Sequence, residues 1–477
     1  MLSSKPLTAP TLARPTDLHP LFQAVKPAPV ALPAAPRGFI PNKEELDPTR
    51  ILAMKCALVM LFVRMAVVPE VIATVLGIAF PVLYLVSPPA MMGCLFTGGF
   101  GRAFSHKSVV IWTLFFLILV AAVPFSSWVG LSFQTASTYA RANLICVYVI
   151  AGTVLTMGEI EKAFKVMAWA GAVVLAVAFK YALPDAEGRL SLDFGEGGGD
   201  ATIANSNDLS AHVLLLLPFM TWYAFQPNQK AWIRYPMIAG MGYSVWVILG
   251  TSSRGAMAAM FLVAFYLFLR SNANQKAMIM LGLPAITAIL FAVLPPANVA
   301  RLVTLFGISQ DAGISAEAEE SRQSRQYLVE QSIKFTLENP VFGIGPGNFS
   351  NYEGMMAAAR GEQGNWHETH NSWTECSSEC GVPALICFVG GLVAAFVAVG
   401  QTYSRAAKVV HGPIMRICVT YQAAMVGYLV CLTFLASAYR FTLPALIGMG
   451  AAIHYAGNRL LDYYTAGDPT DFPVVGK

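Results

Sequence analysis

The feature that most constrains this chain is a series of apolar stretches that follow one another along most of its length. Each is close to the roughly 20 residues that an α-helix needs to cross the hydrocarbon core of a bilayer. Only helices and closed β-barrels satisfy their backbone polar groups in lipid, and the alternating pattern of barrel strands is absent. Charged residues make up 12% of the chain, against roughly 25% in an ordinary soluble domain. We therefore expect an all-α fold, a polytopic helical bundle in a membrane.

About twelve windows satisfy the length criterion for a spanning helix. They lie at residues 51–68, 71–86, 109–124, 142–157, 163–183, 209–225, 235–250, 255–269, 277–294, 382–403, 417–436 and 443–457. The first window is the least secure, because Lys55 and Arg64 lie inside it. The shorter stretch 90–100 predicts a re-entrant or interfacial piece.

The windows divide the chain into five parts. Residues 1–48 are rich in Pro and Ala and lack the apolar segment of a signal peptide, so we expect a disordered cytoplasmic tail. The other parts are a transmembrane bundle of nine helices at 49–294, a large loop at 295–381, the last three helices at 382–458 and a second cytoplasmic tail at 459–477.

The distribution of positive charge predicts the orientation of the bundle. Lys and Arg recur in alternate short loops, such as 102–107 and 230–234, which is typical of cytoplasmic loops. Both termini should therefore lie inside and the large loop outside. The net charge of +4 gives no indication of a nucleic acid partner.

Three arginines lie where an anion could meet them. Arg254 follows Ser253 between two apolar windows, at the membrane surface, where a guanidinium is costly without a partner. It could extend to headgroup phosphates, or it could bind an anionic group carried by a lipid, because its planar fork suits phosphate. Arg322 and Arg325 share one face of a helix expected at 316–338. That face could be solvated, with Arg322 paired to an acid, or it could be directed at one anion.

A glycine-rich segment follows this helix. Asn339-Pro340 should end the helix, and glycines at 343, 345 and 347 predict a turn that can bring backbone N–H groups close to a ligand. The segment lacks the Lys-Ser/Thr ending of a P-loop, and no strand precedes it, so we do not expect a nucleotide site.

The richest polar motif runs from His367 through Glu368, Thr369 and His370 to Asn371 and Ser372, with Glu375, Cys376, Glu379 and Cys380 beyond it. Two histidines and two cysteines offer zinc ligands, but their spacings match neither HExxH nor CxxC, so we expect no metal. Cysteines four apart on one helix are also poorly placed for a disulfide. A histidine at the membrane surface suits a general base better, because imidazole titrates near neutral pH. Upstream, the polar residues 205–208 precede an apolar run and predict a helix N-cap.

The order of these motifs resembles that of the O-antigen ligase and O-antigen polymerase superfamily, the O-antigen ligase-related family of integral membrane glycosyltransferases. Members carry a Ser-Arg at the outer end of a middle helix, an Arg on a loop helix ahead of an Asn-Pro and a glycine turn, and a His-Asn followed by a Glu-x-Gly. The matching elements here are Ser253-Arg254, Arg325, Asn339-Pro340, 343–349, His370-Asn371 and Glu379-Cys380-Gly381, with an Asn-rich element at 205–218. The resemblance covers about residues 205–399.

The resemblance implies an enzyme, a lipid-linked-oligosaccharide glycosyltransferase in the cell inner membrane with its active site facing the periplasm. Its donor would be a glycan on undecaprenyl pyrophosphate among membrane lipids, and its acceptor a lipid A-core or another glycan or protein. Transfer would be inverting and would need no metal or other cofactor. The expected catalytic residues are His370 as general base with Arg254 and Arg325, and the expected substrate-binding residues are Arg322, Gly345, Gly347, Asn371, Glu379, His367 and Asn207.

Other functions share part of this pattern. A polysaccharide polymerase, whose acceptor is a second lipid-linked repeat unit, is the nearest alternative to a ligase, and a protein O-oligosaccharyltransferase comes next. A membrane transporter belongs to a different class and places its charged residues near the membrane midplane. Here the arginines and histidines gather at one face and in one loop, which favours chemistry at the surface.

Overall fold

The computed structural model describes residues 43–78, 82–185, 188–192, 194, 203, 205–271, 273–274, 276–277, 280 and 312–465. These residues are mostly helical, and β1 (Leu183–Pro184) and β2 (Leu190–Ser191) form one short antiparallel pair. The helices are α1 (Lys43–Leu46), α2 (Pro48–Met65), α3 (Val68–Leu76), α4 (Val82–Phe96), α5 (Gly99–Phe104), α6 (Lys107–Ala122), η2 (Val123–Phe125), α7 (Val129–Thr138), η3 (Tyr139–Leu144), α8 (Ile145–Thr153), α9 (Met157–Tyr181), α10 (Ser206–Ala224), α11 (Ala231–Gly250), α12 (Arg254–Arg270), α15 (Ala312–Glu338), α16 (Phe349–Ala359), α17 (Ser372–Lys408), α18 (Gly412–Cys431), η4 (Leu432–Phe434) and α19 (Thr442–Thr465). The helical fold class is confirmed.

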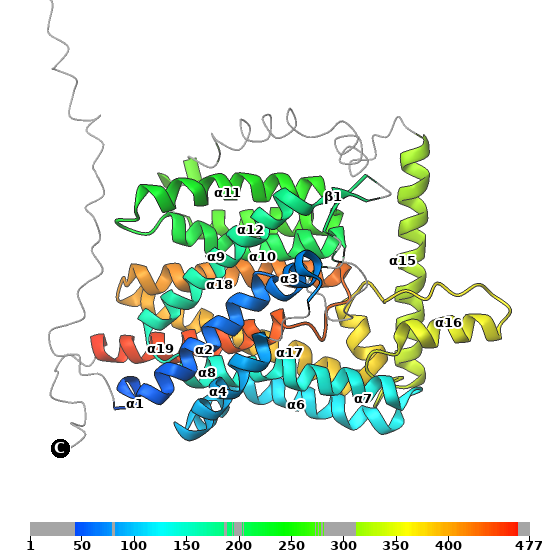
Figure 1. Ribbon diagram of the computed structural model, residues 1–477, viewed down its shortest axis with the longest axis horizontal. Coiled ribbons are helices and arrows are strands. Elements are labelled where there is room, and N and C mark those ends of the chain that lie inside the picture. The colour runs from blue at the N-terminus through cyan, green and yellow to red at the C-terminus, as the bar shows by residue number, and fades with distance from the viewer. Residues whose placement is uncertain are drawn as a thin grey trace, which may run out of the picture. The chain divides into compact units, whose positions relative to one another are not determined.

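Two groups of helices make up the bundle (Figure 1). Helix α10 packs on α9, α11 and α18, while α17 packs on α6, α18 and α19. One continuous hydrophobic core, with residues such as Trp112, Phe164 and Tyr421 fully buried, runs through both groups. The N-terminal helix α2 joins them through α4, α8 and α9.

Four helical segments in the described part of the chain are long and apolar enough to cross a membrane. They are Lys107–Phe125, Met157–Tyr181, Ser372–Lys408 and Gly412–Phe434. A fifth span results if α2 and α3, which meet at a bend of 58°, are counted as one broken helix. The expected number of about twelve is not confirmed: α12, for example, has 17 residues, which is short for a full crossing. The window 277–294 lies almost entirely outside the described residues.

The second predicted window, 71–86, is not one helix, and that prediction was wrong. Helix α3 ends at Leu76, where Gly77 takes a left-handed conformation with φ of 65° that closes the helix. The following described helix begins only at Val82. The first window also ends early, because Val67 is left-handed between α2 and α3. The imidazole of His212 lies 2.7 Å from the carbonyl oxygen that this break frees at Met65.

The large loop carries its own small core. Helix α15 ends at Glu338, directly before Asn339-Pro340, as the sequence predicts. Its side chains Leu328 and Phe335 are buried against Ile344 and Phe349 of the following segment. Helix α15 also packs along α17, so this part of the loop is attached to the bundle. The first part of the expected loop, 295–311, lies outside the described residues.

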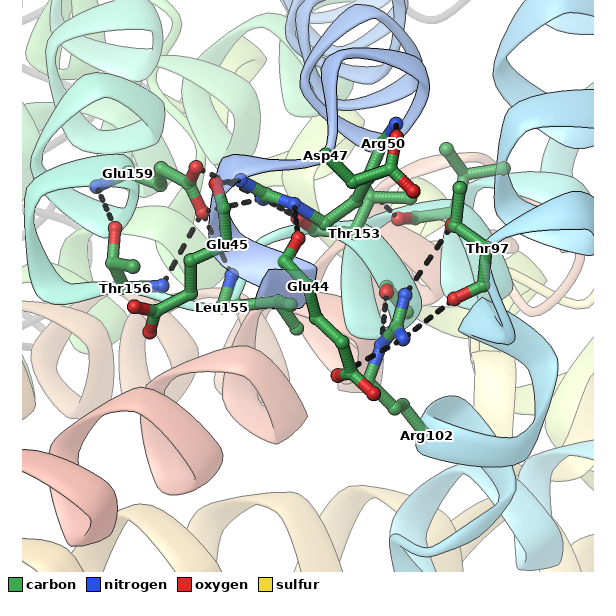
Figure 2. Close-up of polar contacts among 12 residues, drawn as sticks. Glu44, Glu45, Asp47, Arg50, Thr97, Arg102, Thr153, Leu155, Thr156 and Glu159 are labelled. Atoms are coloured by element: carbon green, nitrogen blue, oxygen red, sulfur yellow. Dashed lines mark hydrogen bonds and ion pairs between the residues drawn. The ribbon is translucent and has the colours of Figure 1, made fainter. Parts of the chain in front are cut away.

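A buried ion pair joins the start of α2 to the start of α9 (Figure 2). The guanidinium of Arg50, 1% exposed, donates to both carboxylate oxygens of Glu159, at 2.9 and 3.0 Å, and to the carbonyl of Thr153 at 2.6 Å. It also donates to the carbonyls of Glu44 and Glu45 in α1. These contacts fix α1 to the bundle, so residues 43–48 are not part of a disordered tail, and the remainder of that expected tail, 1–42, lies outside the described residues.

Candidate active site

A cavity of about 450 Å³ lies where the large loop meets the bundle. Its walls come from α7 and η3, from the glycine turn after α15, from the start of α17 and from the segment between η4 and α19. The charged residues that line it are Arg64, Glu368, Glu375, Glu379 and Arg440. Aromatic and hydroxyl side chains complete the wall.

His370 lies directly before α17 and is half-buried, with a left-handed φ of 50°. Burial is the main cause that lowers the pKa of its imidazole to about 4. The nearby positive charge of Arg325 lowers this pKa further, followed by His367 and Arg189. The imidazole is therefore neutral at pH 7 and can accept a proton. The structure thus brings together two of the expected catalytic residues, His370 and Arg325.

The residues after His370 hold it in place. The side-chain oxygen of Asn371 accepts hydrogen bonds from the backbone N–H groups of Trp373, at 3.0 Å, and Thr374, at 3.1 Å, and so forms the N-cap of α17. The hydroxyl of Ser372 donates to the carbonyl of Leu435 at 2.6 Å. Asn371 therefore has a positioning role that the sequence did not predict.

The glycine turn, residues Gly343–Phe349, packs against the first turns of α17. The carboxylate of Glu379 accepts from the N–H groups of Gly347, at 2.7 Å, and Phe349, at 3.0 Å. The backbone carbonyl of Glu379 accepts from the N–H of Gly345 at 2.9 Å. The turn brings its N–H groups to an acceptor, as the glycines predict, but these groups already have Glu379 as their partner.

Gly381 allows this close approach. It interrupts α17 with φ of 84°, and a Cβ there would overlap the carbonyl oxygen of Val341. The N–H of the next residue, Val382, donates to the carbonyl of Pro340 at 2.8 Å. The glycine turn and the Glu-x-Gly motif are thus two halves of one contact, which fixes α15 relative to the start of α17.

Glu353 of α16 fixes the segment that leads to His370. Its side chain, 1% exposed, accepts from the N–H groups of Asn365 and Trp366, each at 3.0 Å. The hydroxyl of Tyr327 on α15 donates to the same carboxylate at 3.1 Å. Glu353 therefore links the segment before His370 to helix α15 at Tyr327, two residues after Arg325.

An ion pair closes the inner side of the cavity. Arg440 donates to Asp208, at 3.1 Å, where Asp208 lies in the first turn of α10. Burial of the Arg440 guanidinium opposes its charged form, but the carboxylates of Asp208 and Glu368 outweigh this and raise its pKa. The Glu368 side chain is open to the cavity, yet the surrounding protein desolvates it enough to raise the pKa of its carboxyl.

Arg64 enters the cavity from the end of α2. Its Nη2 donates to the side-chain oxygen of Asn143 at 3.4 Å, and its guanidinium lies 5.3 Å from the centre of the Phe441 ring. Arg64 is 8% exposed, and among the described residues its buried Nε has no hydrogen-bond partner. Arg64, whose charge made the first predicted span insecure, therefore lines the cavity.

The remaining expected site residues are more dispersed. Arg254 is exposed at the first position of α12, and Ser253 caps this helix, but Arg254 does not line the cavity. Its neighbour Gly255 packs against Phe434, one residue before the Leu435 carbonyl that Ser372 binds. Arg254 thus lies on an element adjacent to the start of α17. Arg322 and His367 are exposed, and Asn207 is half-buried in the first turn of α10.

The N-cap predicted at 205–208 is confirmed. The side chain of Asn205 accepts from the N–H of Asp208 at 3.0 Å. Cys376 and Cys380 are both buried and free. Among the residues that the structure describes, no three His, Cys, Asp or Glu side chains are grouped to hold a metal ion.

Several residues in or near the site were not predicted from the sequence. Arg440 lies between two apolar windows, as Arg254 does, so the same argument about the cost of an arginine at the membrane surface would have found it. Arg189, near His370, lies in an acidic stretch where its positive charge stands out. The polar face of α7 gave no signal, because the stretch 129–138 is too short for a span and carries no charge.

Comparison with known families agrees with this arrangement. Residues 239–389 match the family model described as O-antigen ligase. The matched segment includes Arg254, Arg325, His370 and Glu379. None of the curated proteins compared with the chain matches it. Residues 239–389 are therefore similar to the O-antigen ligase family, and the resemblance that the sequence motifs indicate is confirmed for this segment.

Proposed function

We propose that the chain transfers a glycan from an undecaprenyl-pyrophosphate carrier to an acceptor hydroxyl at the periplasmic face of the inner membrane. The observation that carries this proposal is the proximity of a neutral His370 to Arg325 within the segment that is similar to the O-antigen ligase family. A base beside a cation is what the transfer of a sugar from a pyrophosphate requires. The acceptor is a lipid A-core or another surface glycan.

In this reaction the acceptor hydroxyl attacks the anomeric carbon of the donor sugar from the side opposite the pyrophosphate. His370 takes the hydroxyl proton as the new C–O bond forms. The bond between the anomeric carbon and the pyrophosphate oxygen breaks, and its electron pair leaves with the pyrophosphate. Attack from the opposite side inverts the configuration at the anomeric carbon.

Charge around His370 suits both steps. Arg325 and Arg189 can stabilise the negative charge that develops on the leaving pyrophosphate. The bound pyrophosphate in turn offsets these cations, so the pKa of His370 rises from about 4 and the imidazole becomes a stronger base. Donor binding thus activates the base. Arg254 and Arg322, both exposed, can reach lipid-borne phosphate at the surface.

Reconstitution of the full chain in liposomes, with a synthetic undecaprenyl-pyrophosphate-linked oligosaccharide as donor, tests the proposal. His370→Ala should abolish transfer to the acceptor while membrane insertion stays normal. Gln363→Ala is the control, because it removes an exposed polar side chain of the same segment that does not line the cavity. Transfer near the wild-type rate in the His370→Ala protein would show that the general-base assignment is wrong.

A gel of surface polysaccharide from cells that lack the gene separates ligase from polymerase. A missing ligase leaves long chains on the lipid carrier, whereas a missing polymerase leaves single repeat units. Substrate counterflow in liposomes that is insensitive to changes at His370 and Arg254 would instead indicate a transporter.

A further inference from the structure

The cavity has a lining that the proposed catalytic groups do not explain. Arg254, Arg325 and His370 do not line it, although Glu368 and Thr369, directly before His370, do. One wall is the face of α7 that carries Leu131, Gln134, Thr135 and Thr138, a spacing that places these residues on one side of a helix. The other face of α7 is apolar and exposed, with Val129 and Phe133. Helix α7 therefore turns its polar side inward, toward the cavity.

The charges of the cavity do not suit a pyrophosphate. Three glutamates line it against two arginines, and one of these, Arg440, is paired with Asp208. An ionised carboxylate repels a second anion at short range, and a protonated carboxyl group offers it no positive charge, so neither form favours a pyrophosphate. By contrast, Arg325 and Arg189 lower the pKa of His370, so positive charge lies near His370.

The same lining suits an uncharged polar ligand. A carboxyl group hydrogen-bonds to a hydroxyl in either protonation state, and the rings of Tyr139, Tyr439 and Phe441 offer apolar surface beside it. One donor indicates a missing partner: within the described part of the chain, the buried Nε of Arg64 has no hydrogen bond. Buried donors normally have partners, so a ligand hydroxyl at Arg64 would satisfy one.

We infer that the cavity is a saccharide subsite that binds an uncharged sugar of the donor or of the acceptor glycan. The inference rests on the proposed function and adds the location of the sugar. Because Glu368 and Thr369 line the cavity and His370 follows them, a sugar bound there lies beside the base. The pyrophosphate then lies on the Arg325 side, and the bond that breaks lies between the two regions.

Two substitutions on α7 test the subsite with little risk to folding. Gln134 is exposed to the cavity, so Gln134→Ala removes an amide without opening the core, and Thr138→Val replaces a hydroxyl by a methyl group of the same shape. Native mass spectrometry of the full chain in nanodiscs would compare two probes: undecaprenyl pyrophosphate, and the same carrier with one N-acetylglucosamine. Each variant should weaken the glycosylated carrier by roughly two- to tenfold, the effect of one neutral hydrogen bond, and leave the bare carrier unchanged.

Two control variants show whether a loss of binding is specific to the sugar of the glycosylated carrier. Gln401→Ala removes an exposed glutamine of α17 that does not line the cavity and should change neither probe. Arg325→Ala should weaken both probes, because it acts on the pyrophosphate. If the α7 variants bind the donor normally but raise KM for the acceptor in the transfer assay, the subsite holds the acceptor sugar, and the inference stands.

The inference is overturned if the α7 variants leave glycosylated carrier and acceptor KM unchanged, or if they weaken both carriers equally. Such a result leaves the proposed function intact as long as the wild-type chain transfers glycan. If the wild-type chain binds neither carrier, the proposed function fails first, and the subsite fails with it.

Discussion

At the scale of single residues, the protonation of His370 sets the pH range of the reaction. Its pKa of about 4 means that the imidazole is neutral, and competent as a base, at any pH well above this value. We expect kcat/KM, which reports the free enzyme, to fall only as the pH approaches about 4.

In Arg325→Ala, a positive charge near His370 is lost, the protonated imidazole is less disfavoured, and the pKa of His370 rises. The acid limb of the pH profile should therefore move to higher pH, on top of a lower rate.

Arg360→Ala is the matched control for this shift. Arg360 is also an arginine of the large loop, but it is exposed and paired with Glu362 at 2.8 Å, and it is not among the charges that act on His370. Its removal should leave the acid limb in place. An acid limb that stays fixed in Arg325→Ala would contradict the proximity of Arg325 to His370.

Single residues also show which parts of the candidate site the sequence predicts and which it does not. His370 and Arg325 could be proposed from residue type and motif order, because a base and a phosphate-binding cation are recognisable in isolation. The roles of Arg440 and Glu368 depend on their electrostatic interaction with each other and with Asp208. Asp208 lies more than 150 residues before Glu368 in the sequence. No spacing rule predicts such a pair, since only the packing of α10 beside α18 brings the two segments together.

At the scale of elements, the glycine turn and α17 depend on one carboxylate. Glu379→Gln keeps one oxygen for the N–H of Gly347 or Phe349 but turns an amide donor toward the other N–H. A buried donor left without a partner costs about 1–3 kcal/mol, so we expect a lower Tm in detergent. The loop between α15 and α16 should also be cleaved faster by protease. Transfer should fall, because the contact that fixes α15, and with it Arg325, is weakened.

Glu362→Gln is the control for this substitution. Glu362 is exposed and pairs only with nearby Arg360 among its described contacts, so the same chemical change there should leave Tm and protease resistance unaltered. Equal Tm values for Glu379→Gln and the wild-type chain would mean that the carboxylate does not hold the turn.

Elements were predicted well where one local signal decides them. Asn339-Pro340 ends α15 because the residue before a proline avoids the α region, and Asn205 caps α10. The windows 51–68 and 71–86 place a break near this point but not at Val67, because no glycine marks that residue. The carbonyl freed at Met65 is satisfied by His212 from a distant helix. Likewise, the glycines predicted a turn, but they did not predict that the Glu379 carboxylate would accept hydrogen bonds from its N–H groups.

At the scale of the whole molecule, apolar length alone does not define the bundle. Some helices satisfy the length criterion for a span, and others, such as α10 and α12, pack in the same core but are short or carry polar residues. The apolar windows do not separate these two kinds of helix. Helix α10 has Asp208 and His212 facing other elements, so its polarity serves contacts inside the protein. Polar residues in a window thus mark internal partners, and they lower the apparent number of spans.

The clearest of these internal contacts is the buried pair of Arg50 and Glu159, at the opposite end of α2 from Arg64, about 21 Å away along the helix axis. Arg50→Ala should leave the Glu159 carboxylate buried without its cation, which costs about 3–5 kcal/mol. It should also weaken the attachment of α1, which Arg102 and Arg459 still hold by ion pairs (Figure 2). Thermal unfolding in detergent measures the effect.

A double-mutant cycle decides whether the pair itself is responsible. Removing Glu159 as well, in Arg50→Ala with Glu159→Ala, should recover part of the lost stability, because no unpaired charge then stays buried. The control is Arg405→Ala, which breaks an ion pair with Asp462 whose side chains are 40% and 58% exposed and should cost less than about 1 kcal/mol. If Arg50→Ala lowers Tm no more than Arg405→Ala, the network is not a stabilising centre of the fold. If it lowers Tm strongly while the glycan transfer of the surviving folded fraction is normal, then stability and catalysis are set at separate ends of α2.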